Sequence, residues 1–305
     1  MTGKLYIDNT DVYASYGVFI TLGGYNELLA FNPLKNVESN DWSEEDGIEA
    51  DLSQPALDTK NFSMSFALHG NNNIGAFIAH LSDKSYHIFD FREIDREYKL
   101  RLVSQPNLSI LQRLNIFTLQ FANDFPIPEN YIYTAPQSNI FPDTGYKIDS
   151  LDLSRYGTYV LNGSRSDVLK SPDVKKNLLR SFNNINGVVY DDSAVFFQTK
   201  DVTLNCLMQA ETLSEFWQNY DALLYNLVRP EERILLVDYV GMEYPCYYKS
   251  CKVKNFDTMG KIWFEFALTL VFCSSGMPYL DFALRKVKAN SLRLLGNGNL
   301  RFLKR

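Results

Sequence analysis

The sequence predicts a mainly β protein built from two tandem copies of one domain, each copy carrying one helix among its strands. Its 305 residues are about twice the length of a typical domain. Phe and Tyr, which favour strands, are abundant at 21 and 19 residues. Short segments of the first half recur in the second half in the same order, which indicates an internal repeat.

Two landmarks carry the repeat. Tyr16-Gly17 matches Tyr156-Gly157, and Thr59-Lys60 matches Thr199-Lys200. Both matches have the same separation along the chain, which we call the repeat offset. A third match, IFTLQF with ALTLVF, exceeds the repeat offset by eleven, so the second copy has a net insertion between these points. We therefore expect a first domain over 1–125, a linker over 126–147, a second domain over 148–278 and a basic tail over 279–305.

The expected elements follow the same order in each copy. A short strand (4–8 and 148–153) leads through the Tyr-Gly pair into a second strand, and a polar loop follows. Apolar and polar residues then alternate over 62–66 and 202–206, which predicts a longer strand. After one helix, two or three more strands complete each copy, at 86–91, 99–104 and 114–121 in the first and 233–239, 242–249 and 263–272 in the second.

Residues 212–228 predict the helix of the second copy, and residues 74–81 predict its shorter counterpart. Thr212 is the expected N-cap, with Glu215 completing a capping box, and Pro230 follows the expected end. One face is apolar, formed by Phe216, Tyr220, Leu223, Leu224 and Leu227. Trp217 on this helix and Trp263 in the last strand are expected to pack inward.

Composition excludes several classes of function. The net charge of −6 argues against sequence-specific nucleic-acid binding, which needs a basic face. The start of the chain has no apolar signal core, and no run of 18 apolar residues occurs, so neither secretion by a signal peptide nor membrane insertion is expected. The four cysteines form no C-x-x-C pair and are expected to be reduced, buried thiols.

Charge is concentrated in two segments. The first is an acidic loop with Asp41, Glu44, Glu45, Asp46, Glu49 and Asp51. It is interpreted as a solvated loop, as a loop facing a channel or interface, or as a calcium site, although its spacing does not match an EF-hand. The second is the tail, where Arg293, Arg301, Lys304 and Arg305 are candidates for contacts between subunits and a hairpin is expected around Gly296-Asn297-Gly298.

The sequence offers no catalytic constellation, so no enzyme activity, metal or cofactor is predicted. The spacing of His69, His80 and His87 matches no H-E-x-x-H motif, and no G-x-S-x-G elbow occurs. No pair of carboxylates stands out for glycoside hydrolysis. Gly23-Gly24 lacks the context of a phosphate-binding loop and is interpreted as a turn.

The segments around the Tyr-Gly pairs, DVYASYG at 11–17 and DLSRYG at 152–157, resemble the start of the tube-like domain of phage distal tail proteins. Two tandem copies are also similar to tail-hub proteins. The resemblance implies tail-tube-like β-barrel or sandwich domains in a virion tail protein that is assembled in the host cytoplasm. Distal tail proteins usually carry a different second domain, and here the second domain resembles the first.

The function implied is a ring at the tail tip that joins the tail tube to the baseplate. Its partners would be other copies of itself, as a trimer or hexamer, and the neighbouring tail-tube, tail-tip or hub proteins. A carbohydrate- or receptor-binding β-sandwich is the alternative, since aromatic-rich β-sandwiches often bind sugars. A hydrolase of the virion is a third hypothesis.

Overall fold

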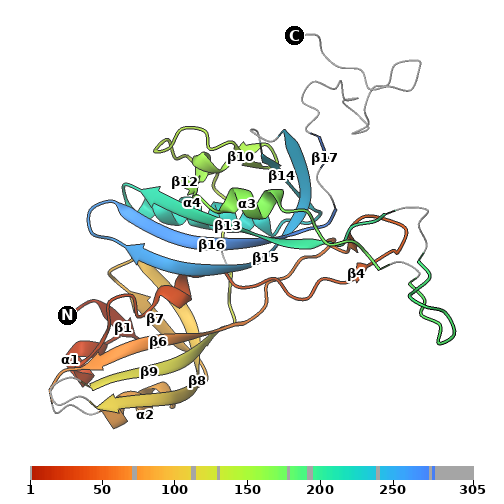
Figure 1. Cartoon of the computed structure of the whole chain (residues 1–305). Coiled ribbons are helices and arrows are strands. Elements are labelled where there is room, and N and C mark those ends of the chain that lie inside the picture. Colours follow the sequence, from red (N-terminus) through yellow and green to blue (C-terminus); the bar gives the residue numbers. More distant parts are fainter. Residues whose placement is uncertain are drawn as a thin grey trace.

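The computed structural model describes residues 2–70, 74–110, 115–128, 131–176, 179–190, 195–237, 241–274 and 277–278. Strands dominate these residues and form two large antiparallel sheets, one from each half of the chain (Figure 1). The predicted mainly β class is therefore confirmed. No helix among the described residues has the length and apolar character needed to cross a membrane.

The first sheet has seven strands in the order β2-β1-β7-β8-β9-β6-β3. They are β1 (Leu5–Ile7), β2 (Thr10–Asp11), β3 (Val18–Ile20), β6 (Lys60–Leu68), β7 (His87–Phe91), β8 (Arg96–Ile110) and β9 (Asn115–Asn123). The helical elements of this half are α1 (Val12–Tyr16), the 3-10 helix η1 (Asn26–Leu29) and α2 (Ile74–Leu81). Helix α2 is the short helix expected from the sequence.

The second sheet has the order β11-β10-β14-β15-β16-β13-β12, with β17 paired to β15. Its strands are β10 (Tyr146–Ile148), β11 (Leu151–Asp152), β12 (Thr158–Val160), β13 (Lys200–Ala210), β14 (Arg233–Val237), β15 (Met242–Asp257), β16 (Ile262–Phe272) and β17 (Met277–Pro278). The helical elements are the 3-10 helix η2 (Leu153–Tyr156), α3 (Ser164–Leu169) and α4 (Leu213–Leu227). Apart from β17, each strand has its counterpart in the same place of the first sheet.

The Tyr-Gly pairs end short helical turns. Asp11 caps α1 by accepting the Ala14 amide at 3.0 Å, and Asp152 caps η2 by accepting the Ser154 amide at 2.9 Å. Gly17 and Gly157 then adopt left-handed φ angles of 68° and 63°, which a residue with a Cβ adopts only at a cost. The sequence predicted a direct passage between two strands, and the structure inserts one helical turn between them.

The Thr-Lys landmarks mark lysines that bind the ends of short helices. Lys60 Nζ donates to the carbonyls of Leu28 and Ala30 at the end of η1. Lys200 Nζ donates to the carbonyls of Val168 and Lys170 at the end of α3, at 2.6 and 2.5 Å. These acceptors are also related by the repeat offset, so both halves satisfy the free carbonyls of a helix end in the same way.

Apolar and polar residues alternate along the strands, and this alternation determines which side chains enter the core. In β6 the alternating side chains of Phe62, Met64 and Phe66 are buried, as the pattern predicts, and Ala67 and Leu68 at the end of the strand are buried as well. In β16 the same period turns Phe264 and Phe266 inward and Trp263 outward, where it is 42% exposed. The inward prediction for Trp263 is therefore wrong, because its neighbours on both sides are apolar and already fill the inner face.

Helix α4 begins and ends as the sequence predicts. Thr212 Oγ1 accepts the Glu215 amide at 3.2 Å, while the Glu215 carboxylate accepts the Glu211 amide at 3.0 Å. The reciprocal bond of the capping box is thus made to the residue before the N-cap. The predicted apolar face is buried. The segment expected as a linker lies on this helix, with Gln218 donating to the Ala135 carbonyl at 2.7 Å.

All four cysteines are buried free thiols. Burial raises the pKa of Cys246 and that of Cys251 to about 12, so these thiols stay protonated and behave as small apolar side chains. The predicted C-terminal hairpin and the tail residues Arg293, Arg301, Lys304 and Arg305 lie outside the described residues.

Candidate self-association surface

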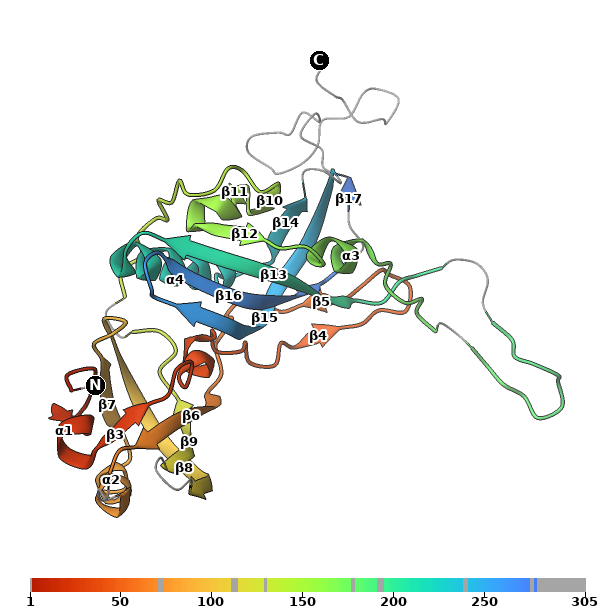
Figure 2. The ribbon, with the colours of Figure 1, turned by 60° about the vertical axis from the view of Figure 1, so that its left-hand side comes forward.

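Each half of the chain carries a long arm just before a central strand, β6 in the first half and β13 in the second. The first arm, residues 33–58, contains the two-stranded sheet of β4 (Ser39–Asn40) and β5 (Glu49–Ala50). The second arm, residues 173–198, is described over 173–176, 179–190 and 195–198. Figure 2 shows the first arm lying along the second sheet and the second arm extending away from it.

The two arms are built alike. The first is bridged at Leu34–Leu57 and Asn40–Glu49, and the second at the positions related to these by the repeat offset, Val174–Phe197 and Arg180–Val189. At the tips, the Glu45 amide donates to the Trp42 carbonyl at 3.4 Å, and the Ile185 amide donates to the Phe182 carbonyl at 3.2 Å. Gly47 and Gly187 both have left-handed φ angles, 71° and 83°.

The tip of the first arm is docked on the second half of the chain. The Gly47 amide donates to the Phe197 carbonyl at 2.8 Å, and the Ile48 amide donates to the Cys273 carbonyl at 2.7 Å. In return the Phe197 amide donates to Asp46 Oδ1 at 2.7 Å. A Cβ on Gly47 would stand 1.6 Å from the Cys273 carbonyl oxygen, so the contact requires glycine.

Lys175 is the centre of this contact. Its ammonium donates to the carbonyls of Trp42 and Gly47 at 2.7 and 2.6 Å, and it pairs with Asp41 Oδ1 at 2.6 Å. The side chain is only 6% exposed. Because the three oxygens surround a buried cation, they offset the cost of removing it from water.

The six acidic residues of the first arm therefore separate into two groups. Asp41 and Asp46 contact the second half as described above. The other four either bond to residues of the same arm or are exposed at its tip. Glu49 accepts the Trp42 indole N–H at 3.2 Å, and hydrogen bonds from Ser53 lower the pKa of Asp51. Glu44 and Glu45 are exposed at the tip. Two carboxylates thus serve an interface within the chain, and the six do not converge on one point.

The residues that lead into the first arm, 29–32, are buried, and we call them the root of this arm. The ring of Phe31 is buried 4.4 Å from that of Tyr220, and the Tyr220 hydroxyl donates to the Leu29 carbonyl at 2.7 Å. The Tyr248 hydroxyl donates to the Asn32 carbonyl at 2.9 Å. The start of the arm therefore belongs to the core of the second half.

Helix α4 joins the two halves next to this root. Arg96 makes two parallel hydrogen bonds to Asp221 at 2.7 and 2.9 Å, and its guanidinium lies 4.4 Å from the centre of the Trp217 ring. The Trp217 indole N–H donates to the Ile94 carbonyl at 2.6 Å. Each polar group in these contacts therefore has a hydrogen-bond partner that offsets its removal from water.

The second arm has no such seat within its own chain, as far as the described residues show. Its described tip, 181–190, has the sequence SFNNINGVVY, without a charged residue. The backbone hydrogen bonds of this tip stay within the arm: Arg180 and Val189 bond to each other, and the Ile185 amide donates to the Phe182 carbonyl. Large apolar side chains at the tip and next to it are 44–52% exposed: Leu179, Phe182, Ile185, Val188 and Val189. Such a cluster of exposed apolar residues is characteristic of an interaction site.

Asp8, His80 and His87 are the only group of three potential metal ligands among the described residues. Asp8 Oδ2 lies 2.6 Å from His87 Nδ1 and 3.5 Å from His80 Nε2, a donor set that suits zinc. However, the Lys84 ammonium lies 2.9 Å from the same oxygen, and a cation there competes with a metal.

The second half shows what this cluster does. Asp149 occupies the corresponding turn and accepts the Ile234 amide at 2.9 Å, as Asp8 accepts the Ile88 amide at 3.0 Å. It pairs with Arg229 and Arg233 at 2.7 and 2.6 Å. Since arginine is not a metal ligand, the shared feature is an aspartate held by cations, which fixes the turn between the first two strands.

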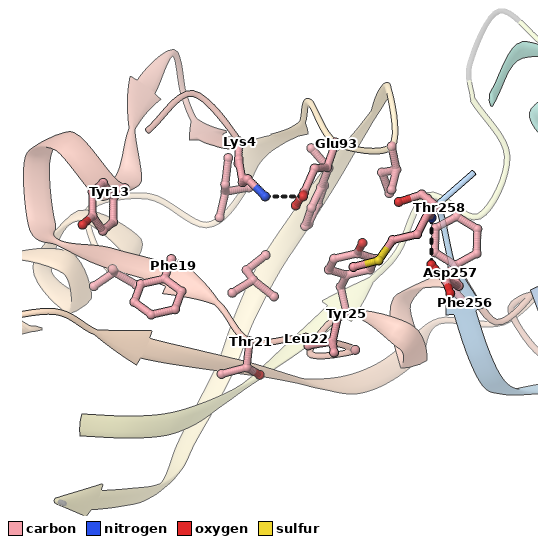
Figure 3. A pocket seen from close by; sticks show the side chains of 17 residues that line it. Lys4, Tyr13, Phe19, Thr21, Leu22, Tyr25, Glu93, Phe256, Asp257 and Thr258 are labelled. Carbon is pink, nitrogen blue, oxygen red and sulfur yellow. Dashed lines mark hydrogen bonds and ion pairs between the residues drawn. The ribbon is translucent and has the colours of Figure 1, made fainter. Parts of the chain in front are cut away.

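A cavity of about 340 Å³ lies between the first half and the turn after β15 (Figure 3). Tyr13, Phe19 and Tyr25 line it from the first half, and Phe256 lines it from the second. Lys4 and Glu93, which also line the cavity, form an ion pair with each other. The rest of the lining is mainly apolar and aromatic.

No protein-family model and no curated protein matches the chain. Among solved structures, the crystal structure of the phage SPP1 protein Dit (gp 19.1), described as a paradigm of the hub adsorption apparatus in phages that infect Gram-positive hosts, matches with 14% identity and a TM-score of 0.32. The match covers 42% of this chain and 48% of that chain. A likeness at this level assigns no function.

Proposed function

We propose that the chain is a ring-forming structural component of a phage or prophage-derived tail tip, and not an enzyme. The observation that carries the proposal is the tandem arrangement of two units with one strand order, in which an arm of the first is seated on the second. A contact that joins unlike surfaces of equivalent units can repeat from unit to unit, and it closes into a ring when the rotation allows.

The DVYASYG and DLSRYG segments support the assignment to a tail tip, because they resemble the tube-like domain of distal tail proteins. In the structure they form the capped helical turns α1 and η2, at matching positions in the two sheets. The duplication of one domain is part of this proposal. So are the joining of tail tube to baseplate, the neighbouring tail proteins as partners, and the virion as the location.

The test is the mass of the assembled particle. Native mass spectrometry and light scattering of the full chain should show a closed trimer or hexamer, and electron microscopy of the same sample should show rings. A trimer would supply six equivalent units to one circle, whereas a hexamer would supply twelve. A species of one chain at every concentration, from micromolar to near-millimolar, would contradict the proposal.

A further inference from the structure

We infer that the second arm of one copy docks on the first unit of the next copy, in the way that the first arm docks on the second unit within one chain. The partner is therefore a second copy of this chain, and the inference rests on the ring-forming function proposed above. It names the surface that joins the copies.

By the seat of an arm we mean the surface that binds its tip, which is centred on Lys175 in the second unit. The first unit has a corresponding surface around Lys35. Lys35 and Lys175 are related by the repeat offset, and the base of each arm is built alike. The Lys35 amide donates to the Ala56 carbonyl at 2.8 Å, as the Lys175 amide donates to the Phe196 carbonyl at 2.7 Å. The two seats differ in occupancy. Lys175 is covered by the first arm, whereas Lys35 is exposed, and its ammonium has no hydrogen bond or ion pair within the described residues.

The tips of the two arms also correspond to each other. The carbonyls of Trp42 and Gly47, which receive the Lys175 ammonium, correspond to those of Phe182 and Gly187 in the second arm. Since the two tips share their turn, the second tip can present the same pair of oxygens to Lys35 of another copy. Asn186 stands where Asp46 stands, and its amide oxygen can accept the backbone N–H of Leu57 as Asp46 accepts that of Phe197.

Within the part of the chain that the structure describes, there is thus one occupied seat and one free seat, and one docked arm and one free arm. Pairing the free arm of one copy with the free seat of the next satisfies both, and it covers the exposed apolar residues of the tip. The contact joins unlike surfaces, head to tail, so it propagates around a ring without a two-fold axis.

The contact between copies should be weaker than the contact within the chain. Ser171 takes the place of Phe31, so the buried aromatic root of the first arm has no counterpart in the second. The tip of the second arm also lacks the ion pair of Asp41, because Ser181 stands in its position. We therefore expect assembly to depend on protein concentration, with intact chains at high dilution.

Charge reversal at the free seat tests the inference. Lys35→Glu replaces the cation that receives the two carbonyls by an anion that repels them, and it should raise the apparent dissociation constant by at least about tenfold in native mass spectrometry. Lys252→Glu, at an exposed site on β15 with the same change of charge, is the control and should assemble like the wild type. Both variants should melt like the wild type at high dilution, because the Lys35 ammonium makes no polar contact within the described chain.

Cysteine pairs give a second readout. Leu57→Cys with Asn186→Cys in one chain should form disulfides between copies, seen as a ladder on a non-reducing gel. The corresponding pair, Asp46→Cys with Phe197→Cys, should close within one chain. The native thiols are buried and do not interfere.

The outcomes distinguish a failure of the arm contact from a failure of the ring-forming function. Rings that persist in Lys35→Glu, with no ladder from the first cysteine pair, would overturn the arm contact and leave the ring-forming function standing. A wild-type chain that never assembles would overturn both.

Discussion

Lys60 and Lys200 show how single residues fix the fold in both units. Each ammonium is desolvated while it binds carbonyls at a helix end. Burial lowers the pKa of Lys60 to about 7, and burial also lowers the pKa of Lys200. Only a long side chain with several donors can reach these carbonyls from the first position of a neighbouring strand. This explains why the lysine of the Thr-Lys pair recurs when most of the surrounding sequence does not.

Asp8→Asn should destabilise the protein at neutral pH by about 2 kcal/mol, because hydrogen bonds to a charged group are lost. Burial alone would raise the pKa of Asp8, but the Ile88 amide, Lys84 and His87 outweigh it and hold the pKa below its ordinary value of 3.8. This carboxylate therefore contributes stability above pH 3.8, and the contribution is lost as the pH falls below that value.

Urea unfolding from pH 3 to 7 measures this effect. The difference between wild type and Asp8→Asn should be present at pH 7 and should shrink as the pH falls from 3.8 towards 3. Glu44→Gln, at an exposed residue, is the control and should show no difference at any pH. A gap between wild type and Asp8→Asn that stayed constant with pH would show that the charge of Asp8 does not matter.

At the scale of elements, the arms show how one hairpin design serves two roles. The first arm has a charged tip that meets a buried lysine, and the second has an apolar, uncharged tip that stays exposed. The second tip and the Lys175 seat were not identified as a site from the sequence. The signal was present, because Lys35 and Gly47 recur as Lys175 and Gly187 at the offset of the other landmarks.

Gly47→Ala and Gly187→Ala form a matched pair for the docking of the first arm. Both place a Cβ on a residue with left-handed φ, which costs about 1 kcal/mol. Only at Gly47 does the Cβ also meet a neighbour, the Cys273 carbonyl, whereas nothing lies within 4 Å of a Cβ on Gly187.

We expect Gly47→Ala to cost about 2 kcal/mol more than Gly187→Ala, the usual magnitude for overfilling a packed site. It should also release the first arm to protease. Urea titration of dilute samples and limited proteolysis at residues 41–50 measure both effects. Equal stability and equal cleavage of the two variants would show that the residues around Gly47 accommodate the added Cβ without loss of stability.

At the scale of the whole molecule, the two units unfold together only if the contacts between them are strong. The Arg96–Asp221 ion pair is one of the polar contacts there, with both side chains 17% exposed. Asp221→Asn keeps the shape and leaves the buried guanidinium without its counter-charge. We expect a loss of about 3 kcal/mol.

Differential scanning calorimetry should then resolve two transitions in Asp221→Asn where the wild type shows one. Glu211→Gln breaks the exposed Lys261–Glu211 pair, whose side chains are 51% and 54% exposed, and should leave the melting curve as it is. A single, unshifted transition in Asp221→Asn would mean that the other contacts, around Phe31 and at Lys175, couple the units without this ion pair.

Local sequence determined the mainly β class, helix α4 with its cap and buried face, helix α2, and the positions of most strands, because alternation and capping are properties of neighbouring residues. The recurring Tyr-Gly and Thr-Lys pairs gave the order of elements in both halves. Only the tertiary structure decided that the first arm crosses to the second half, that Phe31 enters its core, and that Asp41 and Asp46 meet a distant strand. Those contacts join residues far apart in the chain, and their geometry depends on how two sheets are placed, which no local pattern encodes.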